Sequence, residues 1–189
     1  SMQKMNWRHA IVIGLYFGGF QAAMPSLGYI LGEKEFMSLK FCVDENTLIP
    51  RPDTETVVEE VIARTKTGDK ILDLCTGSGA IGISCAKYTS AQRVVCVDKF
   101  EKTLAVAEKN ARINGVSDVC EFIRLDVLEN LSDLKKAYGK FDICVSNPPY
   151  IETDEIEKLE KLRTEIRSGR RKRRTFVLQK NRRGRGIFS

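Results

Sequence analysis

Asn147 and the three residues after it have the types and the order that could hold a planar amino group. The run Asn147-Pro-Pro-Tyr150 follows an apolar segment, residues 141–145. The Asn147 side chain offers a carbonyl oxygen, and Pro148, which has no backbone N–H, still offers its own carbonyl. Two such acceptors orient one NH2 group and turn its nitrogen lone pair toward a reaction partner. Tyr150 adds a ring that can stack on an amide or a base, and the prolines fix this geometry before a substrate arrives.

A glycine-rich stretch upstream has the composition of a cofactor-binding turn. It reads Cys75-Thr-Gly-Ser-Gly79 and follows another apolar run. Glycines let the backbone turn sharply and approach a ligand, and the helix that follows offers free N–H groups. The next apolar run ends in Asp98, 19 residues after Gly79, where a carboxylate can accept hydrogen bonds from a ribose diol. Because dinucleotide-binding folds share this pattern, and a tight structural turn also accounts for the glycines, the ligand stays open.

Asp126 is a third acidic residue placed to bind a nucleoside. It follows the apolar run 119–125, and adenine's amino group lies at that point in a nucleoside site of this topology. Ligands of open α/β sheets collect at the carboxyl ends of the strands, so Asp98, Asp126 and Asn147 would face one crevice. Asp126 also suits the N-cap of a helix over 127–138, and both roles are open.

The candidate residues require a framework that brings the ends of several strands together. Short runs rich in Val, Ile, Leu and Cys predict four strands, and the stretches between them have helical periodicity. This alternation predicts an α/β fold with a parallel sheet and right-handed crossovers. The predicted strands are Lys70–Cys75, Arg93–Asp98, Val119–Leu125 and Phe141–Ser146, and the predicted helices are Ala80–Tyr88, Lys99–Asn114 and Val127–Tyr138.

Two further elements are expected upstream of the sheet. The alternation of Phe36–Val43 predicts a hairpin strand. The prolines of Ile49-Pro-Arg-Pro-Asp-Thr54 predict a stiff turn, after which Asp53 or Thr54 would cap the helix Glu55–Lys66.

The composition is that of a globular protein with one unusual segment. With 42% apolar and 30% charged residues, the chain suits a single α/β domain. The net charge of +6 comes from residues 163–189, which hold 11 Lys and Arg and one acidic residue. Clustered basic residues bind phosphates without needing a fold, so this tail could bind nucleic acid.

The cysteines and an apolar N-terminal segment indicate in which cellular compartment the protein is expected. Six cysteines lie in apolar runs without C-x-x-C spacing, far from the only histidine, His9. This predicts free thiols in a reducing cytoplasm and no metal site. Residues 10–24 are apolar but too short for a bilayer span of about 20 residues, so they predict a packed helix or a damaged segment and no membrane anchor.

Four stretches of the sequence together carry a family resemblance. They are Gly28-Tyr-Ile-Leu-Gly-Glu-Lys-Glu-Phe36, Leu48-Ile-Pro-Arg-Pro-Asp-Thr-Glu55, Asp73-Leu-Cys-Thr-Gly-Ser-Gly-Ala-Ile81 and Ser146-Asn-Pro-Pro-Tyr-Ile151. In this combination they resemble the HemK family of protein-(glutamine-N5) methyltransferases. The resemblance implies a Rossmann-like class I S-adenosylmethionine-dependent methyltransferase sheet, S-adenosyl-L-methionine as cofactor, and a glutamine substrate in the Gly-Gly-Gln motif of peptide-chain release factors.

The resemblance also assigns roles by position. It implies that Asn147, Pro148, Pro149 and Tyr150 hold the substrate amide, and that Arg51–Glu55 helps to close the pocket. The release factor would be the protein partner, and in-line methyl transfer needs no metal, nucleophile or strong base. The implied cofactor contacts are Cys75, Thr76, Gly77, Ser78, Gly79, Asp98, Asp126, Val127 and Asn147.

Two other functions stay open on the same residues. Methyltransferases that act on amino groups of DNA or RNA share the Asn-Pro-Pro-Tyr sequence. A non-catalytic fragment that binds a cofactor, or binds RNA through the basic tail, is the second alternative.

The resemblance divides the chain into three parts. Residues 1–28 match poorly, residues 29–162 form the methyltransferase core, and residues 163–189 are the basic tail. The family continues after its core with a Glu-Pro-x-x-Ala-Leu-x-Gly-Gly-x-Asp-Gly-Leu stretch and more strands, so C-terminal strands are expected to be missing here and activity to be weak or absent. Reading the codons of Arg163–Asn181 one nucleotide later can restore that stretch in register. We therefore hypothesise a shift of reading frame near residues 160–163.

Overall fold

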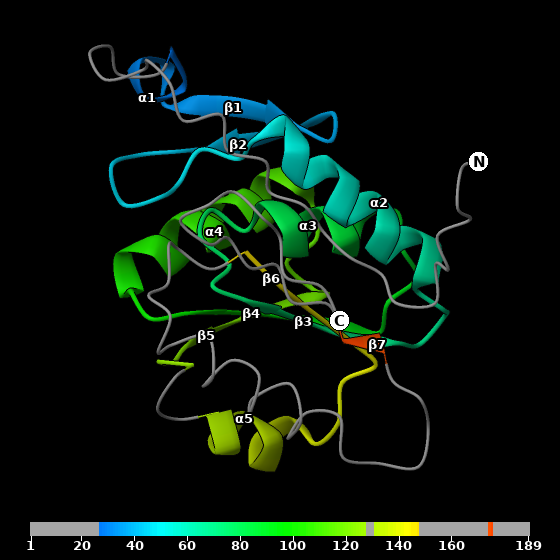
Figure 1. Cartoon of the computed structure of the whole chain (residues 1–189). Coiled ribbons are helices and arrows are strands. Elements are labelled where there is room, and N and C mark those ends of the chain that lie inside the picture. The colour runs from blue at the N-terminus through cyan, green and yellow to red at the C-terminus, as the bar shows by residue number, and fades with distance from the viewer. Residues whose placement is uncertain (1–26, 128–130, 148–173, 176–189) are drawn as a thin grey trace, which may run out of the picture.

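The computed structural model describes residues 27–127, 131–147 and 174–175, and these form an α/β fold (Figure 1). A two-stranded hairpin precedes a five-stranded sheet with helices on both faces. The elements in chain order are α1 Leu27–Leu31, β1 Glu33–Phe36, β2 Leu39–Cys42, the 3-10 turn η1 Pro52–Thr54, α2 Glu55–Arg64, β3 Lys70–Leu74, α3 Ala80–Tyr88, β4 Arg93–Asp98, α4 Glu101–Asn114, β5 Cys120–Arg124, α5 Leu131–Tyr138, β6 Ile143–Ser146 and β7 Arg174–Thr175.

The large sheet is parallel and reverses its strand order beside β3. Its order is β5-β4-β3-β6-β7, and each neighbouring pair is parallel. The chain moves outward from β3 to β5 and then returns past β3 to form β6. Helices α2, α3 and α4 lie on one side of the sheet and α5 on the other (Figure 1). In open α/β sheets ligands bind outside the carboxyl ends of the strands at such a reversal, which here are the ends of β3 and β6.

Buried side chains fill one apolar cluster on each face of the sheet. Because both faces are covered, the strands read as nearly continuous apolar runs, as parallel strands do. Alternate residues of one strand point to opposite faces, so Ile71 and Leu72 of β3 belong to different clusters. The cluster facing α2, α3 and α4 includes Phe36, Phe41, Val58, Ile71, Ile83 and Val94, and the cluster facing α5 includes Leu72, Leu74, Val95, Val97, Leu134 and Phe141.

The predicted strand Phe36–Val43 is wrong as a single element. Met37 and Ser38 form a two-residue turn between β1 and β2, with φ angles of 51° and 56°. Such hairpin turns favour Gly, Asn or Asp because both central residues need positive φ, so Met37 and Ser38 did not indicate a turn. Contacts from outside the hairpin hold the turn: Met37 N–H donates to Glu55 Oε1 (2.9 Å), and the Tyr88 hydroxyl donates to the Met37 carbonyl (2.6 Å).

Helix α2 begins at Glu55 as predicted, but its cap differs from the prediction, and so do the starts of α4 and α5. Helix α4 begins at Glu101 and not at the predicted Lys99. Thr54 stands at the N-cap of α2 in a helical conformation without a side-chain hydrogen bond, because the 3-10 turn Pro52–Thr54 leads into the helix, so neither Asp53 nor Thr54 is its predicted side-chain cap. Val127 lies in a turn and α5 is described from Leu131, so the predicted start at Val127 is wrong.

The edge of the sheet beyond β6 carries one strand that the sequence did not predict. Arg174 and Thr175, from the basic tail, pair in parallel with Ile143 and Cys144. The prediction of a basic tail without a strand is therefore wrong for these two residues.

All six cysteines are free thiols, as predicted. Four are buried, and Cys42 and Cys75 are half-buried. Within residues 27–127, 131–147 and 174–175, no helix has the length and apolar character needed to cross a membrane. The apolar segment 10–24 lies outside these residues.

Candidate functional site

The sheet register brings the predicted site residues to one edge of the sheet. Leu74, at the end of β3, pairs with Val97 on one side and with Ser146 on the other. The turn 75–79 therefore starts beside Asp98 and Asn147, each of which follows one of those partners. Asp126 follows β5 at the same edge, since Asp98 pairs with Arg124. The placement agrees with the order predicted from the sequence, and the role of each residue stays a prediction.

The glycine loop, defined as residues 75–79, is built from left-handed backbone positions. Cys75, Gly77 and Gly79 have φ angles of 57°, 58° and 82°. A Cβ atom on Gly79 would lie 2.5 Å from the Cδ1 atom of Ile83, so this glycine allows α3 to pack closely. A Cβ atom on Gly77 would meet no atom within 4 Å, so at Gly77 the backbone faces open space that a ligand can approach.

Asp73 holds the start of this loop from inside the core. Its Oδ2 atom accepts hydrogen bonds from Thr76 Oγ1 (2.6 Å) and from the N–H of Gly82 (2.9 Å). Its Oδ1 atom is buried without a partner. The Thr76 hydroxyl thus points inward, which leaves only the main chain of Thr76 for a cofactor. Complete burial raises the pKa of Asp73 from 3.8 to about 7, against the lowering effect of both hydrogen bonds.

This pKa predicts a stability that depends on pH. Folded Asp73 holds its proton more tightly than unfolded Asp73, so between pH 4 and 7 its contribution to the unfolding free energy falls as pH rises. Asp73→Asn removes the titration. The unfolding free energy of the variant minus that of the wild type should increase by up to about 1.4 kcal/mol per pH unit over this range and then level off. Urea unfolding at four pH values between 4.5 and 8 measures it, and a constant difference would contradict the assignment.

Asp98 joins β4 to the glycine loop. The residue is 9% exposed, and its Oδ2 atom accepts a hydrogen bond from the N–H of Gly77 (3.0 Å). Its Oδ1 atom accepts from the N–H of Phe100 (3.2 Å). A carboxylate has about four acceptor positions, so two remain for a bound diol.

Asp126 and Val127 have surroundings that the sequence did not indicate. Asp126 Oδ2 lies 2.7 Å from Nζ of Lys99, an exposed residue that no motif singled out. Val127 is 8% exposed and packs with Leu72 and Leu74 in the cluster under α5. Its side chain is thus part of the core, and only its backbone is left for a cofactor contact.

Ser146, the residue before Asn147, links the carboxyl ends of β6 and β3. The Ser146 hydroxyl donates to the Leu74 carbonyl (3.0 Å) in a fully buried position. Burial raises the pKa of the Cys75 thiol beside it to about 12, so this thiol stays protonated at neutral pH. Asn147, the residue after β6, is half-buried. Pro148, Pro149 and Tyr150 lie outside the described residues.

Two residues near the glycine loop differ from what the sequence indicated. Glu55 points to the hairpin, where it accepts from Met37, and is thereby engaged away from the pocket that Arg51–Glu55 was expected to close. Asn110 was not predicted at all, although it is fully buried and hydrogen-bonded to both the hairpin and the glycine loop. Its contacts are distant in sequence, so no local pattern could have indicated them.

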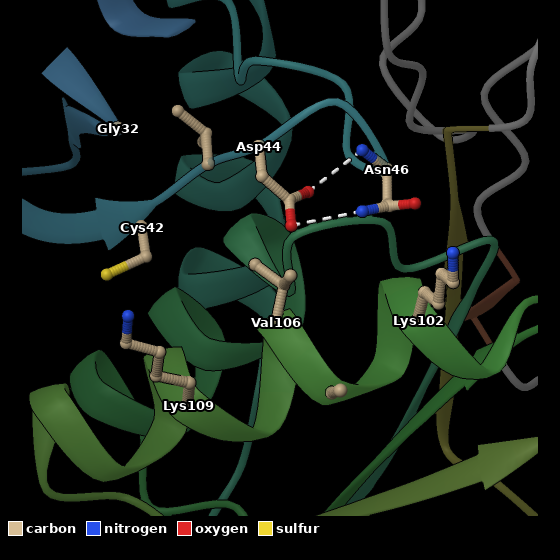
Figure 2. A pocket seen from close by; sticks show the side chains of 9 residues that line it. Gly32, Cys42, Asp44, Asn46, Lys102, Val106 and Lys109 are labelled. Carbon is tan, nitrogen blue, oxygen red and sulfur yellow. Dashed lines mark hydrogen bonds between the residues drawn. The ribbon is translucent and has the colours of Figure 1, made fainter. Parts of the chain in front are cut away.

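A hollow of about 380 Å³ lies between the hairpin and α4 (Figure 2). Asp44, after β2, accepts hydrogen bonds there from the backbone and side-chain nitrogens of Asn46. The lining of the hollow contains none of the candidate site residues, so it is separate from the site at the carboxyl ends of β3 and β6. Its lining includes Cys42, Asp44, Asn46, Lys102, Val106 and Lys109.

Comparisons with known proteins give one family model and two kinds of relatives. The model of the methyltransferase small domain matches residues 53–166. Release factor glutamine methyltransferase of Lactococcus lactis subsp. lactis is 46% identical over 133 residues, which cover 70% of this chain and 46% of the relative. The protein of the same name from Clostridium acetobutylicum is 44% identical over 138 residues, or 72% of this chain and 47% of the relative. The chain thus spans about half the length of these curated relatives.

A solved structure supports the fold. The S-adenosylmethionine-dependent methyltransferase from Agrobacterium tumefaciens superimposes with a TM-score of 0.52 at 17% sequence identity, covering 62% of this chain and 39% of that chain. At this identity the likeness concerns the fold alone.

Proposed function

Since this chain belongs to the methyltransferase small domain family, we propose that it transfers a methyl group from S-adenosylmethionine to a side-chain amide nitrogen of glutamine. Its fold is the Rossmann-like α/β fold of the class I methyltransferases, as predicted. The proposed substrate is the Gly-Gly-Gln motif of a peptide-chain release factor, in line with the names of its relatives. One observation carries the proposal: the glycine loop, Asp98 and Asn147 meet where the strand order reverses.

The residues at the edge of the sheet fit this cofactor chemically. Gly77 offers a backbone surface with open space in front of it, and Asp98 keeps acceptor positions suited to a ribose diol. When bound, S-adenosylmethionine supplies a methyl group on a positively charged sulfur. The protonated Cys75 thiol is a poor nucleophile, so it does not compete with the substrate for that group.

The substrate side of the proposal rests on Asn147. Its side-chain carbonyl would accept one N–H of the glutamine amide, and the carbonyl of Pro148 would accept the other. Both bonds hold the NH2 group in one plane and turn its nitrogen toward the methyl donor. This orientation is the main contribution of the protein, since aligned reactants need no nucleophile from the chain.

Location and further partners follow from the same proposal. A release factor as substrate and six free thiols favour the cytoplasm. Nucleic acid would bind only through the basic residues of 163–189, and no membrane contact is proposed.

We also propose that residues 29–162 form the methyltransferase core and that the tail originates from a shifted reading frame. The nucleotide sequence across codons 155–189 tests the frame directly.

Ligand titration tests the function in its first step. Calorimetry should detect binding of S-adenosylmethionine and no binding of NAD. Binding of NAD alone would overturn the assignment and favour the dinucleotide alternative. Methylation of DNA or RNA, with none of a Gly-Gly-Gln peptide, would favour the nucleic-acid alternative.

A further inference from the structure

Asn110 connects three separate elements through one side chain. It lies on α4 and is 0% exposed. Its Oδ1 atom accepts a hydrogen bond from the N–H of Cys42 (2.7 Å). Its amide nitrogen donates to the carbonyl oxygens of Cys42 and Ser78, both at 2.9 Å. The side chain therefore joins the end of β2 to the middle of the glycine loop.

The contact with Ser78 fixes one peptide plane of that loop. The carbonyl of Ser78 and the N–H of Gly79 belong to the same peptide group. Asn110 holds the carbonyl end, and the Thr76 carbonyl accepts from the N–H end (2.9 Å). Both neighbouring glycines have positive φ, so the loop lacks the steric limits that a Cβ atom imposes on other residues. Hydrogen bonds therefore help to select its conformation, and the one that holds the Ser78 carbonyl comes from outside the loop.

Three backbone groups need a partner here: the N–H and the carbonyl of Cys42, and the carbonyl of Ser78. Only a side chain of this length with one acceptor and two donors satisfies all three. Both N–H groups of the amide are used, and its oxygen is matched to the one donor that faces it. Removing the amide would leave the carbonyl of Ser78 buried without this donor. A buried polar group without a partner is costly, so the loop would rearrange to satisfy it.

We propose that Asn110 is a positioning residue for the cofactor: it holds the glycine loop in the conformation that S-adenosylmethionine binds, and it ties that conformation to the hairpin. The proposal rests on the proposed function for the identity of the ligand. Asn110 does not contact the reacting atoms and acts through Ser78. Its loss should thus weaken cofactor binding and leave the rate at saturating cofactor nearly unchanged.

Asn114 provides a matched control on the same helix. It lies one turn after Asn110, and its amide nitrogen donates to the Lys40 carbonyl of β2 (3.0 Å) and to the Asn110 carbonyl (2.9 Å). Asn114→Ala therefore removes a hydrogen bond to the same hairpin and leaves the Ser78 contact in place. A purely structural role of α4 toward the hairpin would give both variants similar behaviour.

Calorimetric titration of the chain with S-adenosylmethionine tests the proposal. Asn110→Ala should weaken binding on the order of 10-fold or more, and Asn110→Asp should weaken it further, because a carboxylate oxygen would face the carbonyls of Cys42 and Ser78. Asn114→Ala should stay within about 2-fold of the wild type. If Asn110→Ala does not fold, Asn110→Ser, which keeps one hydroxyl donor, replaces it. Equal affinities of the Asn110 and Asn114 variants would overturn the proposal while leaving the function intact.

Hydrogen exchange tests the positioning role of Asn110 independently of the proposed methyltransferase function. Without any ligand, the amides of Gly77 and Gly79 should exchange faster in the Asn110 variants than in Asn114→Ala and the wild type. Unchanged exchange in the Asn110 variants would refute the positioning role, whatever the ligand. A wild-type chain that binds no S-adenosylmethionine would refute the proposed function, and the exchange result would still decide the role of Asn110.

Discussion

Asn147→Ala should lower kcat for glutamine methylation on the order of 100-fold or more. The substitution removes one of the two acceptors proposed to orient the amide nitrogen, so the substrate would bind with its lone pair turned away from the methyl donor in most encounters. The affinity for the cofactor should change less than kcat, because Asp98 and the glycine loop remain. Steady-state kinetics with a Gly-Gly-Gln peptide measure the first effect, on a chain whose tail is restored to the shifted reading frame if the unrepaired chain is too slow. Calorimetry with S-adenosylmethionine measures the second effect.

Asn147→Asp is the matched variant for this experiment. It keeps an acceptor oxygen at the same distance from the backbone and changes only the NH2 group, so its kcat should fall less than that of the alanine variant. An alanine variant as fast as the wild type would show that residues 147–150 are only a turn.

Asp98→Ala should weaken S-adenosylmethionine binding by about 1.5–3 kcal/mol, or roughly 10- to 150-fold. The variant loses the carboxylate proposed to accept from the ribose diol. It also leaves the N–H of Gly77 without its Oδ2 partner, which loosens the glycine loop. Titration calorimetry gives the dissociation constant.

Asp118→Ala is the control for charge. Asp118 is exposed in the turn before β5, at the amino end of that strand, and carries the same charge at the opposite edge of the sheet. Its loss should leave the affinity unchanged. Equal weakening by both substitutions would mean that net charge, and not a contact made by Asp98, sets the affinity.

The parallel sheet could be predicted because strands that are buried on both faces have nearly continuous apolar sequences. Runs such as 94–97 and 143–145 are apolar throughout, and their separation by helical patterns leaves few topologies. The positions of Asp98 and Asn147 followed directly, since residues that end parallel strands share one edge. Strand ends differ by a residue or two, as with Cys75, which enters the glycine loop.

Features that depend on distant contacts could not be predicted. The turn at Met37 and Ser38 has no glycine, and it is held by Glu55 and Tyr88 from other elements. Thr76 turns inward because the buried carboxylate of Asp73 accepts its hydroxyl. Asn110 looks like an ordinary helical residue until the fold brings Cys42 and Ser78 to it.

Mass spectrometry of a Gly-Gly-Gln release factor, incubated with this chain and S-adenosylmethionine, shows whether the chain methylates glutamine. We expect one methyl group on the glutamine side chain of that motif, and its loss when the chain carries Asn147→Ala. An unmodified glutamine in a sample where the chain demonstrably binds S-adenosylmethionine and methylates DNA or RNA would contradict the proposed function.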